Sequence, residues 1–189
     1  MANSRRSRPA VPSYNVAALL RSAPGTERRY PVEDARLKIA ADLALAAPIE
    51  GEVRLARTGR SILARAHLTT AIEATCARCL RPIVAPINVD IEEEALPSVD
   101  IDSGAAVDQR TEPDVLRLDE HHQLDLDEPV REAISLADPI SLLCRPDCRG
   151  LCLECGVDLN DLAEHTHPEE ELDPRLARLA DWRESSDTN

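Results

Sequence analysis

The chain has 189 residues, of which 43% are hydrophobic and 30% charged, a composition that suits one globular domain. Its formal net charge of −13 and its aromatic content of 2%, with no phenylalanine, argue against autonomous nucleic-acid binding through a basic groove or stacking platform. The core must therefore be aliphatic. No stretch is long and apolar enough to span a membrane, and the N-terminal segment is too short and polar for the core of a secretory signal.

Residues 1–13 are dominated by Arg, Ser and Pro, which indicates a disordered basic arm. Alternating apolar and polar residues then predict strands over residues 37–45, 52–55, 62–76 and 83–91, with a turn at residues 58–60. We expect these four strands to form an antiparallel meander, which could close into a barrel. Pro86 cannot donate a ladder hydrogen bond, so the fourth strand is predicted to lie at an edge.

Residues 97–113 are acidic and lack periodicity, so we expect a long mobile loop. Two short strands should flank residues 119–122, and a helix should begin at Asp127 or Glu128 and end before Pro139. The predicted fold class is α+β: a meander with one packed helix and a small cysteine-rich zinc module near the C-terminus. We divide the chain into the arm, an α+β domain (14–143), a cysteine-rich knuckle packed on it (144–160), and an acidic tail with a short helix (161–189).

Six cysteines fall into two groups, and both groups have the spacing of zinc ligands. The first group is Cys76 and Cys79, and the second is Cys144, Cys148, Cys152 and Cys155. Because zinc takes four ligands, the sequence leaves open which four bind. We favour Cys76 and Cys79 with Cys152 and Cys155, since Gly156 directly follows that second pair and permits the turn; a site made only from the second group is the alternative.

Two other uses of these cysteines are less favoured. A disulfide framework would require an oxidising compartment, for which the sequence shows no secretory signal. The spacing of Cys148, Cys152 and Cys155 also occurs in iron–sulfur radical enzymes, but such enzymes need a large barrel around the cluster. Zinc is therefore the expected cofactor.

Negative charge is concentrated between Asp90 and Glu128. This range contains fourteen acidic residues and two arginines, which gives a local net charge of −12. The simplest interpretation is a solvated acidic surface that keeps the protein soluble. The same charge would also suit a basic protein partner.

The two cysteine motifs in this order, with Gly150, Leu151 and Cys152 at the centre of the second and a helix that begins Asp-Leu-Asp-Glu-Pro between them, resemble the YceD family of large ribosomal RNA subunit accumulation proteins. The resemblance extends from about Leu37 to Leu179. It implies a cytoplasmic bacterial protein needed for normal levels of large-subunit ribosomal RNA. Its partner would be a precursor of the large subunit or a basic ribosomal protein, with rRNA contacted indirectly or through the basic arm, and with no membrane or small-molecule substrate.

We do not expect an enzyme. The five histidines, His67, His121, His122, His165 and His167, are not accompanied by a Ser-His-Asp order, a phosphate loop or a dinucleotide turn. His165 and His167 follow the last cysteines closely enough to be reserve ligands, although their acidic surroundings favour bystanders. The alternative function is a redox-regulated holdase or protein-interaction adaptor whose zinc is released when the thiols are oxidised.

Overall fold

The structure, a computed structural model, describes residues 11–107, 115–162 and 164–167. It divides into two compact units, Met1–Cys148 and Arg149–Asn189, which are described separately below. The predicted cysteine-rich knuckle, residues 144–160, is thus divided between the units after Cys148. Among the described helices, none combines the length and the apolar composition needed to cross a membrane.

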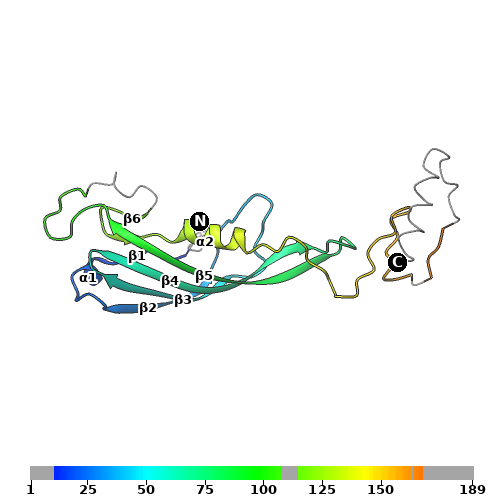
Figure 1. The fold of residues 1–189 in the computed structure, drawn as a ribbon, viewed down its shortest axis with the longest axis horizontal. Coiled ribbons are helices and arrows are strands. Elements are labelled where there is room, and N and C mark those ends of the chain that lie inside the picture. Colours follow the sequence, from blue (N-terminus) through cyan, green and yellow to red (C-terminus); the bar gives the residue numbers. More distant parts are fainter. Residues whose placement is uncertain (1–10, 108–114, 163, 168–189) are drawn as a thin grey trace, which may run out of the picture. The chain divides into compact units, whose positions relative to one another are not determined.

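The first unit is built on a five-stranded sheet whose strands follow the order of the sequence (Figure 1). They are β2 (Glu27–Ala35), β3 (Ile49–Thr58), β4 (Ser61–Thr75), β5 (Pro82–Pro97) and β6 (Leu116–Leu118). Strands β2 to β5 form an antiparallel meander, while β6 runs parallel to β5. The α+β class is confirmed. The expectation of a purely antiparallel, barrel-like sheet is corrected, because the described strands form an open mixed sheet with β2 and β6 at its edges.

The hydrophobic core lies on one face of this sheet. Alternate residues of β4 and β5 are buried, and the same alternation continues into β3, as expected for strands with one solvent face. The core side chains of these strands are aliphatic: Val53, Leu55, Ile62, Ala64, Leu68, Ile72, Ala85, Ile87, Val89 and Ile91. The opposite face carries the charged residues.

The predicted helix is confirmed as α2 (Asp127–Leu136), which lies against β5. Val130 and Ile134 are buried on its inner side, and Asp127 and Glu128 occupy the first turn, where negative charge suits the helix dipole. Both predicted short strands are also present, as β6 and β7 (Gln123–Leu124). Strand β7 pairs with β1 (Tyr14–Asn15), which leads into the one-turn helix α1 (Ala17–Leu20).

The strand predicted over residues 37–45 is wrong. This segment is irregular, apart from a bridge between Leu45 and Ile72. The position beside β3 is taken by β2, whose Ala35 pairs with Ile49, so residues 36–48 form the connection between the two strands. The apolar residues of that connection still pack on the core, which accounts for the alternating pattern.

The prediction that the fourth strand forms an edge holds for residues 83–91 of β5 but not for its C-terminal end. Strand β5 lies between β4 and β6, but β6 covers only Ala95, Leu96 and Pro97. Pro86 pairs with Ala71 of β4 in the part of β5 that β6 does not reach. Proline is tolerated there because, among the described residues, no strand pairs with the other side of β5 at that position.

The predicted acidic loop is described as far as Val107. Val99 forms a bridge with Ala106, and Asp100 accepts hydrogen bonds from the backbone N–H groups of Asp102 and Ser103. Most of the predicted basic arm and the helix expected near Asp173 lie outside the described residues; Val11, at the end of that arm, is buried.

Candidate metal centres

The first group of cysteines lies in the turn that joins β4 to β5. Cys76 N–H donates to the carbonyl of Arg81 at 2.9 Å, and Leu80 N–H donates to the carbonyl of Cys76 at 3.0 Å. Leu80 has a φ of 58°, which closes the turn in the left-handed region. Both thiols are withdrawn from solvent, with Cys76 0% and Cys79 5% exposed.

The segment after α2 delivers Cys144 and Cys148 to this turn. Ala77 N–H donates to the carbonyl of Leu142 at 2.8 Å, which fixes the segment two residues before Cys144. Arg78 Nη1 donates to the carbonyl of Cys148 at 2.8 Å, which holds the segment again at its other end. One backbone and one side-chain hydrogen bond thus bring residues more than 60 positions apart into one cluster.

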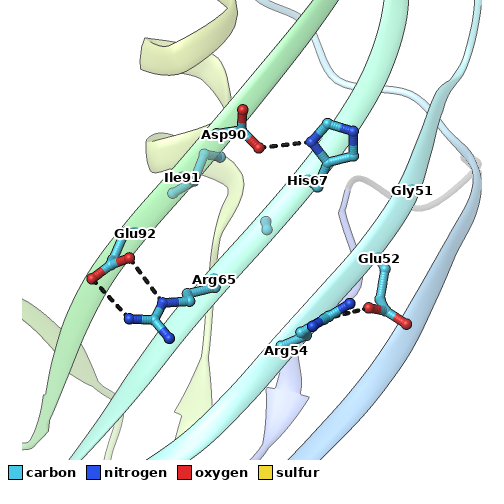
Figure 2. Close-up of a pocket in the computed structure, with 9 residues that line it drawn as sticks. Gly51, Glu52, Arg54, Arg65, His67, Asp90, Ile91 and Glu92 are labelled. Carbon is cyan, nitrogen blue, oxygen red and sulfur yellow. Dashed lines mark hydrogen bonds and ion pairs between the residues drawn. The ribbon is translucent and has the colours of Figure 1, made fainter.

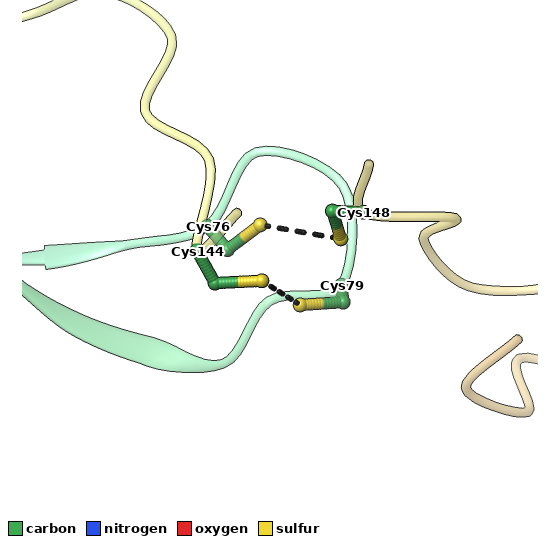
Figure 3. A group of neighbouring side chains, drawn as sticks. All are labelled: Cys76, Cys79, Cys144 and Cys148. Atoms are coloured by element: carbon green, nitrogen blue, oxygen red, sulfur yellow. Dashed lines mark hydrogen bonds between the residues drawn. The ribbon is translucent and has the colours of Figure 1, made fainter. Parts of the chain in front are cut away.

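The four sulfur atoms form a compact group (Figure 3). Cys76 Sγ lies 3.8 Å from Cys148 Sγ, and Cys79 Sγ lies 3.6 Å from Cys144 Sγ. A disulfide would need about 2.05 Å, and all four are free thiols. A tetrahedral zinc ion with bonds of about 2.3 Å to sulfur would have edges of about 3.8 Å between its ligands. The group therefore has the dimensions of a tetrathiolate metal centre.

The thiols of this group differ in acidity. The backbone N–H of Cys79 donates toward Cys76 and lowers the pKa of Cys76 to about 6. Although Cys144 as a residue is exposed, its thiol faces the group, where partial desolvation and the neighbouring sulfurs raise its pKa to about 12. Metal coordination requires thiolates, so binding of an ion at this group would release the protons that the remaining thiols keep.

This grouping differs from the quartet that the sequence favoured. The structure brings Cys76 and Cys79 together with Cys144 and Cys148, and it places Cys152 and Cys155 in the second unit with other partners. The physical reason is the hydrogen bond from Ala77 N–H to the carbonyl of Leu142, which brings the segment just before Cys144 to the β4–β5 turn. The alternative set, Cys144, Cys148, Cys152 and Cys155, is not the observed grouping either.

In the second unit, Cys152 and Cys155 lie beside His165 and His167. Cys152 Sγ is 3.1 Å from His167 Nε2, and Cys155 Sγ is 3.2 Å from His165 Nε2. The sequence interpretation considered these histidines as reserve ligands but favoured bystanders. Their position ten and twelve residues after Cys155, with a single residue between them, is the signal that identifies them as partners of the cysteine pair.

A hollow of about 560 Å³ lies on the charged face of the sheet (Figure 2). Its charged residues pair across strands: Arg65 with Glu92 at 2.8 Å and His67 with Asp90 at 2.7 Å. Serine, threonine and cysteine are absent from its lining residues.

Comparison with known proteins defines the class of this protein. The sequence model for the family "Large ribosomal RNA subunit accumulation protein YceD" matches residues 64–182, which include both cysteine groups. The chain belongs to the YceD family.

Relatives of this chain are found in mycobacteria and in a plant. Uncharacterised proteins of Mycobacterium tuberculosis and Mycobacterium bovis are 34% identical over 131 residues, covering 69% of this chain and 59% of each relative. The chloroplastic YCED homolog 1 of Zea mays, named a large ribosomal RNA subunit accumulation protein, is 36% identical over 44 residues, 23% of this chain and 15% of its own. No solved structure matches the chain.

Proposed function

We propose that this protein is a non-enzymatic, cytoplasmic factor for biogenesis of the large ribosomal subunit, and that it supports accumulation of large-subunit rRNA. The family match over residues 64–182 is the observation that carries this proposal. The name of the plant homolog points to the same role for that protein. Because the chain spans 59% of the length of its mycobacterial relatives, the activity of those whole proteins is carried over only as part of this proposal.

The cofactor that fits the tetrathiolate group is zinc. Four thiolates in a tetrahedron select zinc among the common divalent ions, and a closed set of four protein ligands is typical of a structural site. Zinc at this position would join the β4–β5 turn to the segment that follows α2. Its role is to hold the two segments together and to present a fixed surface, with no open coordination position for catalysis.

The proposed partner is a basic protein surface on a large-subunit precursor or ribosomal protein. Several acidic residues between Asp90 and Glu128 are already used by the fold: Glu92 pairs with Arg65, Glu94 accepts a hydrogen bond from Ser61, and Asp100 holds a turn. Glu93 and Asp102 are exposed nearby and are the better candidates for external contacts. Exposed charges accelerate association with an oppositely charged surface, and salt weakens that effect.

Affinity capture of the tagged full chain from growing cells tests this partner. We expect large-subunit precursors or their proteins to be enriched over small-subunit proteins, and the enrichment to decrease as salt rises. A Glu93→Gln, Asp102→Asn variant should capture less at equal expression. A variant with the same charge change elsewhere, Glu132→Gln with Asp138→Asn, is the matched control. Equal capture by both variants would place the contact outside the acidic region, and no ribosomal enrichment at any salt would contradict the proposed function.

A further inference from the structure

The second unit contains a separate set of four ligand atoms. We propose that it binds its own zinc ion through Cys152 Sγ, Cys155 Sγ and the Nε2 atoms of His165 and His167. All four atoms lie within 4.8 Å of one another, and the two Nε2 atoms are 2.8 Å apart. Two thiolates and two imidazoles form one of the common tetrahedral zinc sets. The proposal uses no residue of the tetrathiolate group.

The backbone around the cysteine pair forms a tight turn of the kind that binds metal through two thiolates. Cys152 N–H donates to the carbonyl of Val157 at 2.8 Å, and Gly156 N–H donates to the carbonyl of Cys152 at 2.9 Å. Gly156 has a φ of 73°, a conformation that glycine adopts without steric cost. The turn closes with a bridge between Leu151 and Asp158, so both sulfurs are presented on one side of a tight loop.

A carboxylate orients one of the histidines. His167 Nδ1 lies 3.2 Å from Glu154 Oε2, while its Nε2 faces Cys152. A metal-bound histidine usually donates its second ring N–H to a carboxylate or carbonyl, which fixes the tautomer and the orientation of the ring. Glu154 comes from the same loop as the two cysteines, between Cys152 and Cys155. A chance cluster of histidines and cysteines would not need a carboxylate on the second ring nitrogen, so the contact between Glu154 and His167 supports metal binding at these residues.

The second unit has little else to hold it together. None of its described residues belongs to the hydrophobic core, and the side chains of Leu153 and Leu162 are 103% and 50% exposed. Small modules without a core depend on metal or disulfides for a fixed structure. Zinc bound at these four residues would therefore fold the described part of this unit, since metal-binding energy becomes folding energy when no site exists in the unfolded chain.

Zinc content of the full chain, purified under reducing conditions and exchanged into metal-free buffer, tests the proposal. We expect two zinc ions per chain in the wild type and one in a His165→Ala, His167→Ala variant. A His67→Ala, His121→Ala variant removes two histidines outside the group and should keep both ions. One ion in the wild type, or two in the His165→Ala, His167→Ala variant, would overturn the proposal. The ion of the tetrathiolate group is counted separately in a Cys76→Ser, Cys79→Ser variant.

Cobalt spectroscopy of the wild type and of the same variant identifies the ligand types directly. The difference spectrum is obtained by subtracting the spectrum of the cobalt-loaded His165→Ala, His167→Ala variant from that of the cobalt-loaded wild type. It should contain thiolate charge-transfer bands. Its d–d bands should lie at shorter wavelength than those that remain in the variant. A difference spectrum without thiolate bands would overturn the assignment. Glu154→Gln should weaken zinc binding at this site by about 10-fold in chelator competition, against no change for Glu164→Gln. Equal affinity in both would remove the role given to Glu154.

Discussion

Cys76 Sγ and Cys148 Sγ lie 3.8 Å apart, although 72 positions separate them in the sequence. The contact joins the turn between the two longest strands to the segment that leaves α2. It occurs at the last residue of the first unit. A metal ion at this point would stabilise the end of the sheet at the β4–β5 turn, which β6 does not reach because it pairs with Ala95–Pro97 at the other end of β5.

Replacing Cys148 by serine should remove the zinc ion of the tetrathiolate group and leave the second ion in place. We expect the free energy of unfolding to fall by about 3 kcal/mol or more, a fraction of the 10–16 kcal/mol typical of zinc peptides because the sheet keeps its hydrophobic core. Zinc analysis and chemical denaturation measure both effects. If zinc in the first unit instead used Cys76, Cys79, Cys152 and Cys155, Cys148→Ser would keep its full zinc content.

Ile72→Ala should destabilise the first unit strongly. Ile72 is fully buried in β4, and the loss of a large aliphatic side chain from a packed core costs about 2–5 kcal/mol. Val84→Ala, on the solvent face of β5 where Val84 is 65% exposed, should change stability by about 0.5 kcal/mol or less. Denaturant unfolding of the two variants gives the comparison, and similar losses in both would show that the core face is misassigned.

Gly51→Ala should be among the most damaging single changes in the sheet. Gly51 has a φ of +149°, and an added Cβ would lie 2.1 Å from the backbone oxygen of His67 in β4. Because the obstacle is backbone, the two strands would have to separate, and we expect a loss of about 3–5 kcal/mol. Gly59→Ala, at a φ of +64° with open space around it, should cost only about 1 kcal/mol. Equal thermal stability of the two variants would contradict this reading of β3.

Asp119 should make a pH-dependent contribution to stability. Its carboxylate accepts the backbone N–H groups of Gln123 and His121, each at 2.8 Å, and these bonds lower its pKa below the ordinary value. A carboxyl group with a lowered pKa stabilises the fold above its unfolded pKa of about 4, and that contribution is lost as pH falls through the folded value. Asp119→Ala should therefore be less stable than the wild type at pH 7, and the difference should shrink below pH 4. A difference that stays constant from pH 7 to pH 2 would exclude the charged form as the cause.

The long strands and α2 could be predicted because each has a strong local pattern. Alternation in β4 and β5 extends over many residues, and Pro129 with Asp127 marks the first turn of the helix. Residues 37–45 show the limit of that reasoning, because alternation reports which side chains meet the core and not whether the backbone has a ladder partner. Strand β2 was missed because it is a mostly exposed edge strand, with Arg28, Arg29 and Pro31 in place of an apolar face.

The candidate metal ligands were predicted by type more successfully than by grouping. Cysteine spacing identified all six thiols, but which thiols meet depends on the hydrogen bond between Ala77 and Leu142, a contact with no local signature in the sequence. His165 and His167 were undervalued because their acidic surroundings resemble a solvated tail. Their partnership with Cys152 and Cys155 is set by how the loop folds back.

Sedimentation profiles of depleted cells test most directly the proposed role of this protein in supporting the large ribosomal subunit. We expect depletion to lower mature large subunits and their rRNA relative to small subunits, during both fast growth and growth in the cold. Wild-type protein supplied in trans should restore the ratio, whereas Cys76→Ser with Cys79→Ser at equal abundance should not. An unchanged ratio of large to small subunits after depletion under both growth conditions would contradict the account.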